Sequence, residues 1–188
     1  MTTWILATQN PHKLAEVQQI VGSSVHLLSL PPGLPVAEEK ESTLYGNALA
    51  KARFYRPYVN YPVLAEDSGL FVPALGGKPG VHSAHYGGPE RLLQELPPYT
   101  EPYAYFAAVV VAYLSEHEYY FFYGLWEGRL SRELRGTEGF GYDPIFIPTG
   151  EERTVAELGQ SWKVQHSHRA RAFQKWLAWL SSQRQMGL

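Results

Sequence analysis

The chain has 188 residues, 45% of them hydrophobic, so it is long enough for one domain with a sizeable core, and disorder is not expected. Its 16 basic and 18 acidic residues give a formal charge of −2, which offers no electrostatic basis for broad binding to nucleic acid or membranes. The absence of cysteine excludes disulfides, thiolate metal sites and cysteine nucleophiles. No apolar run approaches the ~20 residues of a membrane span, and the N-terminus lacks a signal-peptide pattern. We therefore expect a soluble, cytoplasmic protein.

The chain begins with a predicted strand, a polar turn and a helix. Residues 4–7 (WILA) are typical of a short buried strand. Asn10 suits a helix N-cap, Pro11 suits the first helical position, and Gly22 can end the helix. The unpaired N–H groups at this helix start, with Lys13 in the first turn, favour an anion such as a phosphate chain. An ordinary capped helix with a solvated lysine fits the same residues.

Acidic residues follow in two separate segments. A proline-rich loop over residues 30–42 ends in Glu38 and Glu39, and the spacing then predicts a helix from Thr43 that ends before Pro57. The next predicted strand, PVLAED, ends in Glu66 and Asp67, and a turn is expected at Ser68 and Gly69. Carboxylates from two separate segments can together hold Mg²⁺. The candidate ligands are Glu38, Glu39, Glu66 and Asp67. The run EEKE alone also fits a solvated charge run, whereas acids at a buried strand exit are costly unless paired.

The second half of the chain predicts a long surface loop over residues 75–89 and a short helix at RLLQEL. Two β-rich runs, YFAAVVVAYL and YYFFYGLW, predict an antiparallel hairpin. A glycine-rich turn, EGFGYDP, leads into a further strand. The last helix is predicted to be amphipathic, with one apolar face formed by Phe173, Trp176, Leu177 and Leu180. The mixture indicates an α/β fold with a mixed sheet.

Two of these late segments can contact a ligand. The glycines of GFGYDP allow the backbone to approach a flat ligand while a ring stacks on it, although a plain tight turn fits equally. His168 and Arg169 fall in the first turn of the last helix, where a cation gains nothing from the helix dipole. That position suggests an anionic or polar partner, with a surface arginine as the simpler alternative. Together with the helix start and the acids, these features predict a nucleotide phosphate hydrolase.

Seven ordered blocks between residues 7 and 170 carry a family resemblance: ATQNPHK, EE…T…NALAKA, EDSGL, PGVHSAHY, GFGYDPIF, AEL and K…SHRA. The chain resembles the inosine triphosphate pyrophosphatase family. The resemblance implies a single domain over residues 1–188, with an elongated mixed β-sheet, flanking helices and two lobes around a central cleft. It also implies Mg²⁺-dependent hydrolysis of ITP, dITP and XTP to the monophosphate and pyrophosphate, by a homodimer.

The same resemblance assigns roles to individual residues. Asp67 matches the catalytic acid that activates water, and Glu39 and Asp67 match the metal ligands. The residues that match substrate contacts are Thr8, Gln9, Asn10, Pro11, His12, Lys13, Lys51, Ser68, Phe140, Gly141, Tyr142, Asp143, Lys163, His168 and Arg169. Phe140 is the expected stacking ring for the base.

The chain departs from the family pattern at several positions. Glu66 stands where an aspartate is usual, Gly46 where a glutamate is frequent, and His85 where an arginine is usual, and the segment between residues 88 and 105 is short. Two alternatives stay open. One is a Maf-like nucleotide pyrophosphatase with another base preference, against which GFGYDP and SHRA argue. The other is a nucleotide-binding module without turnover, which the retained acids and lysines disfavour.

Overall fold

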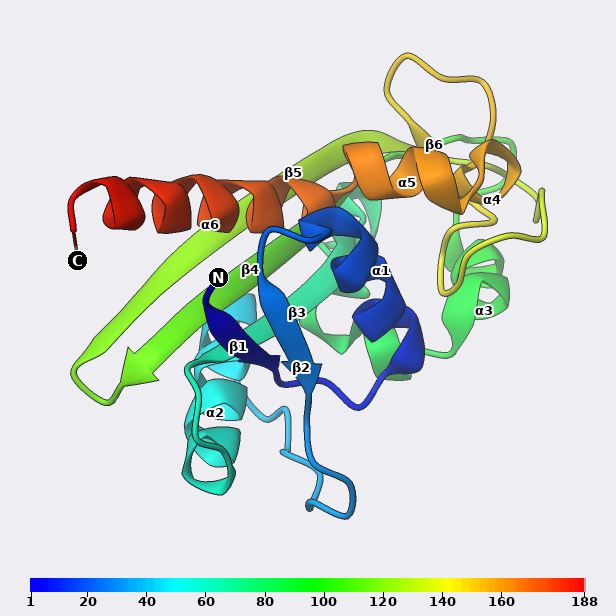
Figure 1. The fold of residues 1–188 in the computed structure, drawn as a ribbon. Helices are drawn as coiled ribbons and strands as arrows, with labels where there is room; N and C mark the ends of the chain where they lie inside the picture. The colour runs from blue at the N-terminus through cyan, green and yellow to red at the C-terminus, as the bar shows by residue number, and fades with distance from the viewer. Residues whose placement is uncertain (188) are drawn as a thin grey trace. The chain divides into compact units, whose positions relative to one another are not determined.

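The computed structural model describes residues 1–187, and its strands and helices alternate over the first half of the chain (Figure 1). The strands are β1 (Thr3–Leu6), β2 (His26–Ser29), β3 (Val63–Phe71), β4 (Tyr103–Ser115), β5 (Glu118–Leu130) and β6 (Phe146–Pro148). The α-helices are α1 (Pro11–Val21), α2 (Leu44–Tyr55), α3 (Gly88–Glu95), α4 (Val155–Leu158), α5 (Gln160–His166) and α6 (His168–Gln185). Short 3₁₀ helices are η1 (Arg56–Tyr58), η2 (Pro73–Leu75) and η3 (Gly80–His85).

The strands form one six-stranded sheet in the order β2-β1-β3-β4-β5-β6. Strand β1 pairs in parallel with both β2 and β3, whereas β5 and β6 are antiparallel. Neighbouring strands β4 and β5 are joined by only two residues, as expected for the predicted hairpin. The predicted α/β class with a mixed sheet and flanking helices is therefore confirmed.

The chain divides into two compact units, which are described separately. The first comprises residues 1–67, 108–124 and the chain from residue 169 on, and the second comprises residues 68–107 and 125–168. Strands β3, β4 and β5 each contribute residues to both units. No helix within residues 1–187 is long and apolar enough to cross a membrane.

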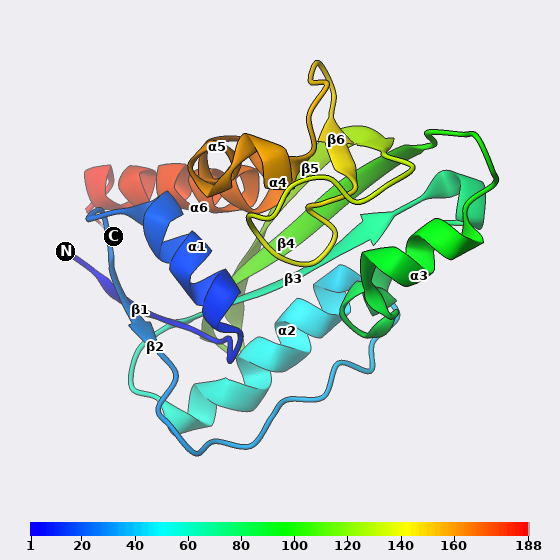
Figure 2. The same cartoon turned by 90° about the vertical axis from the view of Figure 1, so that its right-hand side faces the viewer.

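The core of the first unit lies between the sheet and helices α1 and α6. Trp4 and Leu6 of β1 point to the side where α1 and α6 pack, and Trp4 meets Trp176 edge-on at 5.3 Å between ring centroids. Because side chains alternate along a strand, Ile5 points to the opposite side. Helix α2 covers that side (Figure 2). Burial of Phe173, Trp176 and Leu180 confirms the predicted apolar face of the last helix.

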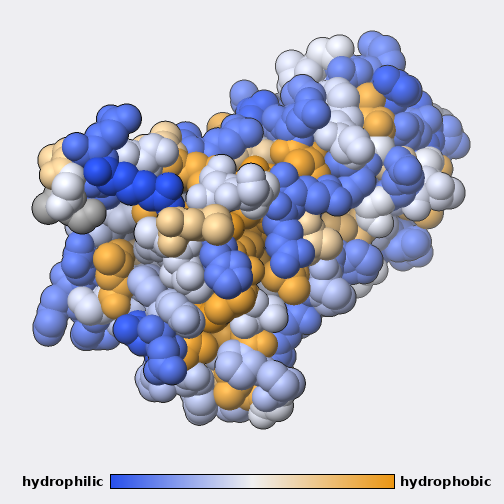
Figure 3. Space-filling view, viewed as in Figure 1, coloured by the Kyte–Doolittle hydropathy of each residue, from blue (hydrophilic) through white to orange (hydrophobic). Residues whose placement is uncertain are grey.

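The core of the second unit is rich in aromatic rings. Phe106 of β4 stacks on Trp126 of β5 and meets Phe146 of β6 edge-on, with centroids 6.1 and 4.7 Å apart. Leu70, Leu92 and other apolar residues complete this cluster. On the outside, hydrophobic residues are interspersed with hydrophilic ones (Figure 3), as is usual for a folded protein surface.

The expected turn at Ser68 and Gly69 is wrong, because β3 continues without interruption from Val63 to Phe71. Gly69 serves close packing instead: a Cβ there would lie 2.2 Å from the carbonyl oxygen of Gly80. The Ser83 hydroxyl accepts a hydrogen bond from the Leu70 amide at 2.9 Å and donates to the Gly80 carbonyl at 2.6 Å. Gly69, which suggested a turn in the sequence, therefore allows the segment with Gly80 and Ser83 to pack closely against β3.

The segment expected to be a long surface loop, residues 75–89, also differs from the prediction. It contains the six-residue helix η3, and α3 already begins at Gly88, one turn before the predicted RLLQEL. Gly80 within it is buried against β3. Strand β2 and helices α4 and α5 were not predicted from the sequence.

Candidate active site

The turn between β1 and α1 is built as a capped helix start. The Asn10 side chain accepts hydrogen bonds from the amides of His12 and Lys13, at 2.9 and 3.3 Å, which confirms the predicted N-cap. Thr8 accepts from the Asn10 amide at 3.1 Å, and Pro11 occupies the first helical position. Pro11 has no N–H, and the Leu14 amide donates to the Asn10 carbonyl at 3.1 Å, so the amides of the first turn are already paired. The expectation of unpaired N–H groups is therefore wrong, and what this turn presents to an anion is the positive end of the helix dipole with Lys13.

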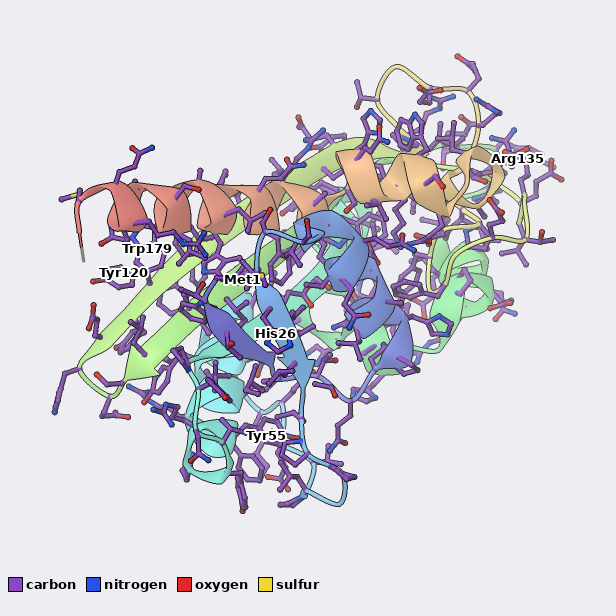
Figure 4. The ribbon with its side chains drawn as sticks, in the orientation of Figure 1. Met1, His26, Tyr55, Tyr120, Arg135 and Trp179 are labelled. Carbon is purple, nitrogen blue, oxygen red and sulfur yellow. The ribbon has the colours of Figure 1, made fainter. Side chains whose placement is uncertain are left out.

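Gln9 in the same turn contacts the proline-rich loop. Its side-chain amide donates to the Leu34 carbonyl at 3.3 Å. The hydroxyl of Tyr55, at the end of α2, donates to the Pro35 carbonyl at 3.0 Å and accepts from the Ala37 amide at 3.1 Å (Figure 4). The loop that carries the acids at its end is therefore held by side chains of the first unit.

Glu66 and Asp67 are both buried within β3, and the alternation of the strand sends them to opposite faces. Glu66 shares the face of Leu64, toward α1 and α6. There its two carboxylate oxygens meet the ammonium of Lys13 and the guanidinium of Arg169, each at 3.4 Å. The second acid, Asp67, points toward α2.

Arg169, at the start of α6, is 2% exposed, so the surface-arginine alternative is wrong. Besides Glu66 it binds the carboxylate of Glu16 at 2.7 Å, and Glu16 is itself fully buried on α1. Both carboxylates raise the pKa of Arg169, although burial opposes the charged form. Since a buried charge is costly unless it is paired, this set is a closed group of opposite charges that ties α1, β3 and α6 together.

Helix α2 supplies the partners of Asp67. Asn47 donates from its side-chain amide to Asp67 at 3.0 Å. One helical turn later, the ammonium of Lys51 lies 2.9 Å from the carboxylate of Glu39 and 3.0 Å from the Glu66 carbonyl oxygen. Burial lowers the pKa of Lys51, but the nearby acids outweigh it and leave the pKa raised, so Lys51 stays charged.

The pKa of Asp67 is raised from 3.8 to about 6. Burial is the largest cause, and the negative charges of Glu39 and Glu66 act in the same direction, while Lys51 and Lys13 oppose it. A carboxylate whose charged form is disfavoured in this way is suited to accept a proton or a cation near neutral pH.

The carboxylate oxygens at and near Asp67 are suitable ligands for a hard divalent cation. Carboxylate oxygens are the ligands that Mg²⁺ prefers. A bound cation would also offset the negative charges of Glu39 and Glu66, which raise the pKa of Asp67. Within residues 1–187, no three acidic or histidine side chains form a complete metal cage. Mg²⁺ usually takes one or two carboxylates and completes its shell with water and phosphate oxygens.

Glu38 and Glu39 differ although they are neighbours in the sequence. Glu38 is exposed and pairs with Lys40, as a solvated charge run predicts. Glu39 is paired with the buried ammonium of Lys51 and acts on the pKa of Asp67. Of the two acids, the structure thus turns Glu39 toward the Asp67 cluster.

In the second unit, the segment GFGYDP forms a buried ion pair. One oxygen of Asp143 accepts from the Phe140 amide at 3.0 Å and from the ammonium of Lys163 at 2.8 Å. The same ammonium lies 4.0 Å from the centroid of the Phe140 ring. Lys163, on α5, therefore fixes both the acid and the ring of this turn.

The other predicted residues of the second unit have packing partners. Tyr142 is buried and donates its hydroxyl to the Ser83 carbonyl at 2.7 Å; burial raises its pKa to about 12. His168 stacks on Phe106 at 4.7 Å between centroids. Gly141 is exposed between Phe140 and Tyr142, and Ser68 follows Asp67 directly in β3.

The structure thus brings the predicted residues together as two sets. One, in the first unit, joins the α1 start with Glu39, Lys51, Asp67 and Arg169, and the other, in the second unit, joins Phe140, Asp143 and Lys163. Sequence reasoning missed Glu16 and Asn47. Both could have been found by helical spacing, because Glu16 lies three residues after Lys13 and Asn47 four residues before Lys51, on the same helix faces.

Comparison with known proteins places residues 4–179 within the model of the Ham1 family. A dITP/XTP pyrophosphatase of Porphyromonas gingivalis is 40% identical over 185 residues, which cover 92% of this chain and 94% of that protein. A dITP/XTP pyrophosphatase of Leifsonia xyli subsp. xyli is also 40% identical and covers 92% of each chain.

Solved structures give the same result. A Ham1 protein from Coxiella burnetii superimposes with a TM-score of 0.87 at 35% identity, covering 97% of this chain and all of that one. The Ham1 protein of Staphylococcus aureus superimposes with a TM-score of 0.83 at 33% identity, covering 96% and 99%. The fold is therefore shared along nearly the whole chain.

Proposed function

From the premise that this chain belongs to the Ham1 family, we propose that it hydrolyses dITP, XTP and ITP to the monophosphate and pyrophosphate. The predicted family is confirmed, and the enzyme is a nucleoside triphosphate pyrophosphatase. Neither the Maf-like alternative nor a module without turnover is supported by these relatives. The structural observation that carries the proposal is a buried acid, Asp67, with its pKa raised to about 6 among lysines and further acids.

The charged set of the first unit supplies what a triphosphate requires. The start of α1 offers the positive end of the helix dipole, and Lys13 and Lys51 offer full positive charges. Charge on the leaving pyrophosphate grows as the bond to the α-phosphorus breaks, and fixed cations stabilise that charge. In our proposal the two lysines exchange part of their contact with Glu39 and Glu66 for contact with phosphate oxygens.

Asp67 acts as the general base. It removes a proton from a water molecule as the water oxygen forms a bond to the α-phosphorus, and the bridging bond between the α- and β-phosphates breaks. The proton remains on Asp67 until the products leave.

Glu39 and Asp67 would hold Mg²⁺. When bound, the ion withdraws charge from phosphate oxygens and makes a water molecule more acidic. Glu66 is assigned another role, because its two oxygens already meet Lys13 and Arg169. It balances those cations and keeps them oriented, and it is not proposed as a ligand of the ion.

The second unit supplies recognition of the base. Phe140 offers a ring for stacking, and Lys163, held by Asp143, offers a donor beside it. A hypoxanthine or xanthine base presents an oxygen at position 6, which a donor satisfies. Adenine presents an amino group there, which would leave two donors facing each other, so adenine nucleotides are rejected.

We also propose that residues 1–188 act as a single domain, that the protein is a cytoplasmic homodimer, and that it cleanses the nucleotide pool. The other residues of the proposed site are Thr8, Gln9, Asn10, Pro11, His12, Ser68, Gly141, Tyr142, His168 and Arg169. The family resemblance supports these statements.

A panel of nucleoside triphosphates with and without Mg²⁺ tests the function. Separate assays for pyrophosphate and for phosphate identify the bond that is cleaved. We expect pyrophosphate release from dITP, ITP and XTP that requires the cation, and a kcat/KM for dATP lower by about 100-fold or more. Equal values for dATP and dITP would contradict the base-selectivity argument, and phosphate release would contradict the reaction.

A further inference from the structure

We infer that Asn47 is a positioning residue that joins the two segments from which the cation ligands come. This inference rests on the proposed function, in which Glu39 and Asp67 bind a divalent cation. The two acids come from different parts of the chain, the end of the proline-rich loop and the middle of β3. Their separation must be fixed before both can contact one ion.

Asn47 contacts both segments with one side chain. Its amide nitrogen donates to the carboxylate of Asp67 at 3.0 Å, and its amide oxygen accepts from the backbone amide of Glu41 at 2.9 Å. Glu41 follows Glu39 by two residues. A carboxamide carries its donor and its acceptor on two separate atoms of one rigid group. An ionised aspartate has no donor and alanine has neither group, while serine has a single oxygen on a shorter side chain that cannot reach both partners.

The position of Asn47 is itself well determined. The residue is 3% exposed and lies in the first turn of α2, where its backbone amide donates to the Thr43 carbonyl at 3.1 Å. Thr43 caps the helix by accepting from the Gly46 amide at 3.0 Å. A Cβ on Gly46 would lie 2.8 Å from the Cβ of Glu41, so this glycine lets the loop approach the helix closely enough to reach Asn47.

The contact to Asp67 has a direct consequence for cation binding. A donor on one carboxylate oxygen holds the group in one rotamer and leaves the other oxygen available for the ion. Outer partners of metal ligands act in this way, and their removal typically lowers metal affinity or activity about 10- to 100-fold. Lys51, one turn further along α2, contacts Glu39 from the same face and restricts the other ligand.

The test measures binding of Mn²⁺ alone, by electron paramagnetic resonance of the free ion, in the absence of nucleotide. We expect Asn47→Ala to weaken Mn²⁺ binding about 10-fold or more, with a parallel loss of kcat. Alanine favours the helix, so α2 should persist. Asn47→Ser, which keeps a small polar group but cannot reach both partners, should give the same loss and serves if the first variant folds poorly.

Thr43→Ala is the matched control. It removes the cap of the same helix and lowers the Tm, but it has no contact with Asp67 or Glu39, so Mn²⁺ affinity should stay at the wild-type value. Wild-type affinity in both Asn47 variants would overturn the inference. So would an equal loss in Thr43→Ala, because the effect would then follow helix stability and not position.

Asp67→Asn separates this inference from the proposed function. We expect that variant to lose Mn²⁺ binding. If it binds Mn²⁺ as the wild type does, the cation site itself is wrong, and the role of Asn47 falls with it. If Asp67→Asn loses binding while the Asn47 variants keep it, the proposed function stands and only the positioning role is overturned.

Discussion

The two units of this protein differ in the groups that surround their buried charges. The first carries a dense set of buried opposite charges, in which the acids of α1, the loop and β3 alternate with Lys13, Lys51 and Arg169. The second carries one buried ion pair, Asp143 with Lys163, and surrounds it with aromatic rings. In our proposal the first set binds the triphosphate and a cation, and the second binds the flat base.

The comparison also explains the composition of the motifs. The boundary between the units passes between Asp67 and Ser68 and again between His168 and Arg169. The block EDSGL therefore contributes two acids to the first unit, and SHRA contributes Arg169 to it, while Ser68 and the stacked ring of His168 belong to the second unit. A motif that mixes charged and aromatic or small residues serves two kinds of chemistry at adjacent positions.

The largest expected effect comes from removing the acid at the centre of the first unit. Asp67→Asn should lower pyrophosphate release from dITP by about 10²- to 10⁴-fold, as expected for loss of a general base, while circular dichroism shows an intact fold. The asparagine keeps an oxygen that can accept from Asn47. Near wild-type turnover would remove Asp67 from its assigned role.

The raised pKa of Asp67 predicts a pH dependence of stability. The carboxyl binds its proton more tightly in the folded protein than at its ordinary value of 3.8, so its contribution favours folding at low pH and is lost as pH rises through about 6. Without divalent cations, Asp67→Asn should therefore be more stable than the wild type above about pH 7, by up to about 3 kcal/mol, and gain little near pH 4. Chemical unfolding at the two pH values measures this; a gain that is equal at both would contradict it.

The second unit is tested through its ring. Phe140→Ala should lower kcat/KM for dITP by about 5- to 150-fold, because stacking on one base contributes about 1–3 kcal/mol. Inhibition by inorganic pyrophosphate, which has no base, should not change. If pyrophosphate inhibition weakens as much as dITP hydrolysis, the assignment of base binding to the second unit and phosphate binding to the first is wrong.

The smallest effect is expected at Glu38, the exposed neighbour of Glu39. Glu38→Gln should leave kcat/KM for dITP within about two-fold of the wild type, since an exposed pair with Lys40 contributes little. Glu39→Gln, assayed beside it, should lose at least about 10-fold, as expected when a cation ligand is weakened. The opposite ranking would contradict the assignment of Glu39 as the cation ligand.

Much of the fold followed from local signals. The start of α1 is marked by Asn10 and Pro11, and the start of α2 by Thr43, because capping depends on residues within one turn. The spacing up to Pro57 indicates where α2 ends. The β4–β5 hairpin and the apolar face of α6 followed from periodicity. The turn expected at Ser68 and Gly69 failed, because the use of that glycine depends on Gly80 in a different segment.

The sequence by itself determined the class of fold, the family and the kinds of residue at the site, because these depend on patterns along the chain and on motif order. Only the tertiary structure decided the partners of each charge. In "VLAEDSGLFV", strand alternation sends Glu66 to Lys13 and Arg169 and sends Asp67 to Asn47, although the two acids are adjacent. The pKa of a carboxyl depends on the charges and burial that three-dimensional packing brings to it, and so does the choice between a structural and a catalytic acid.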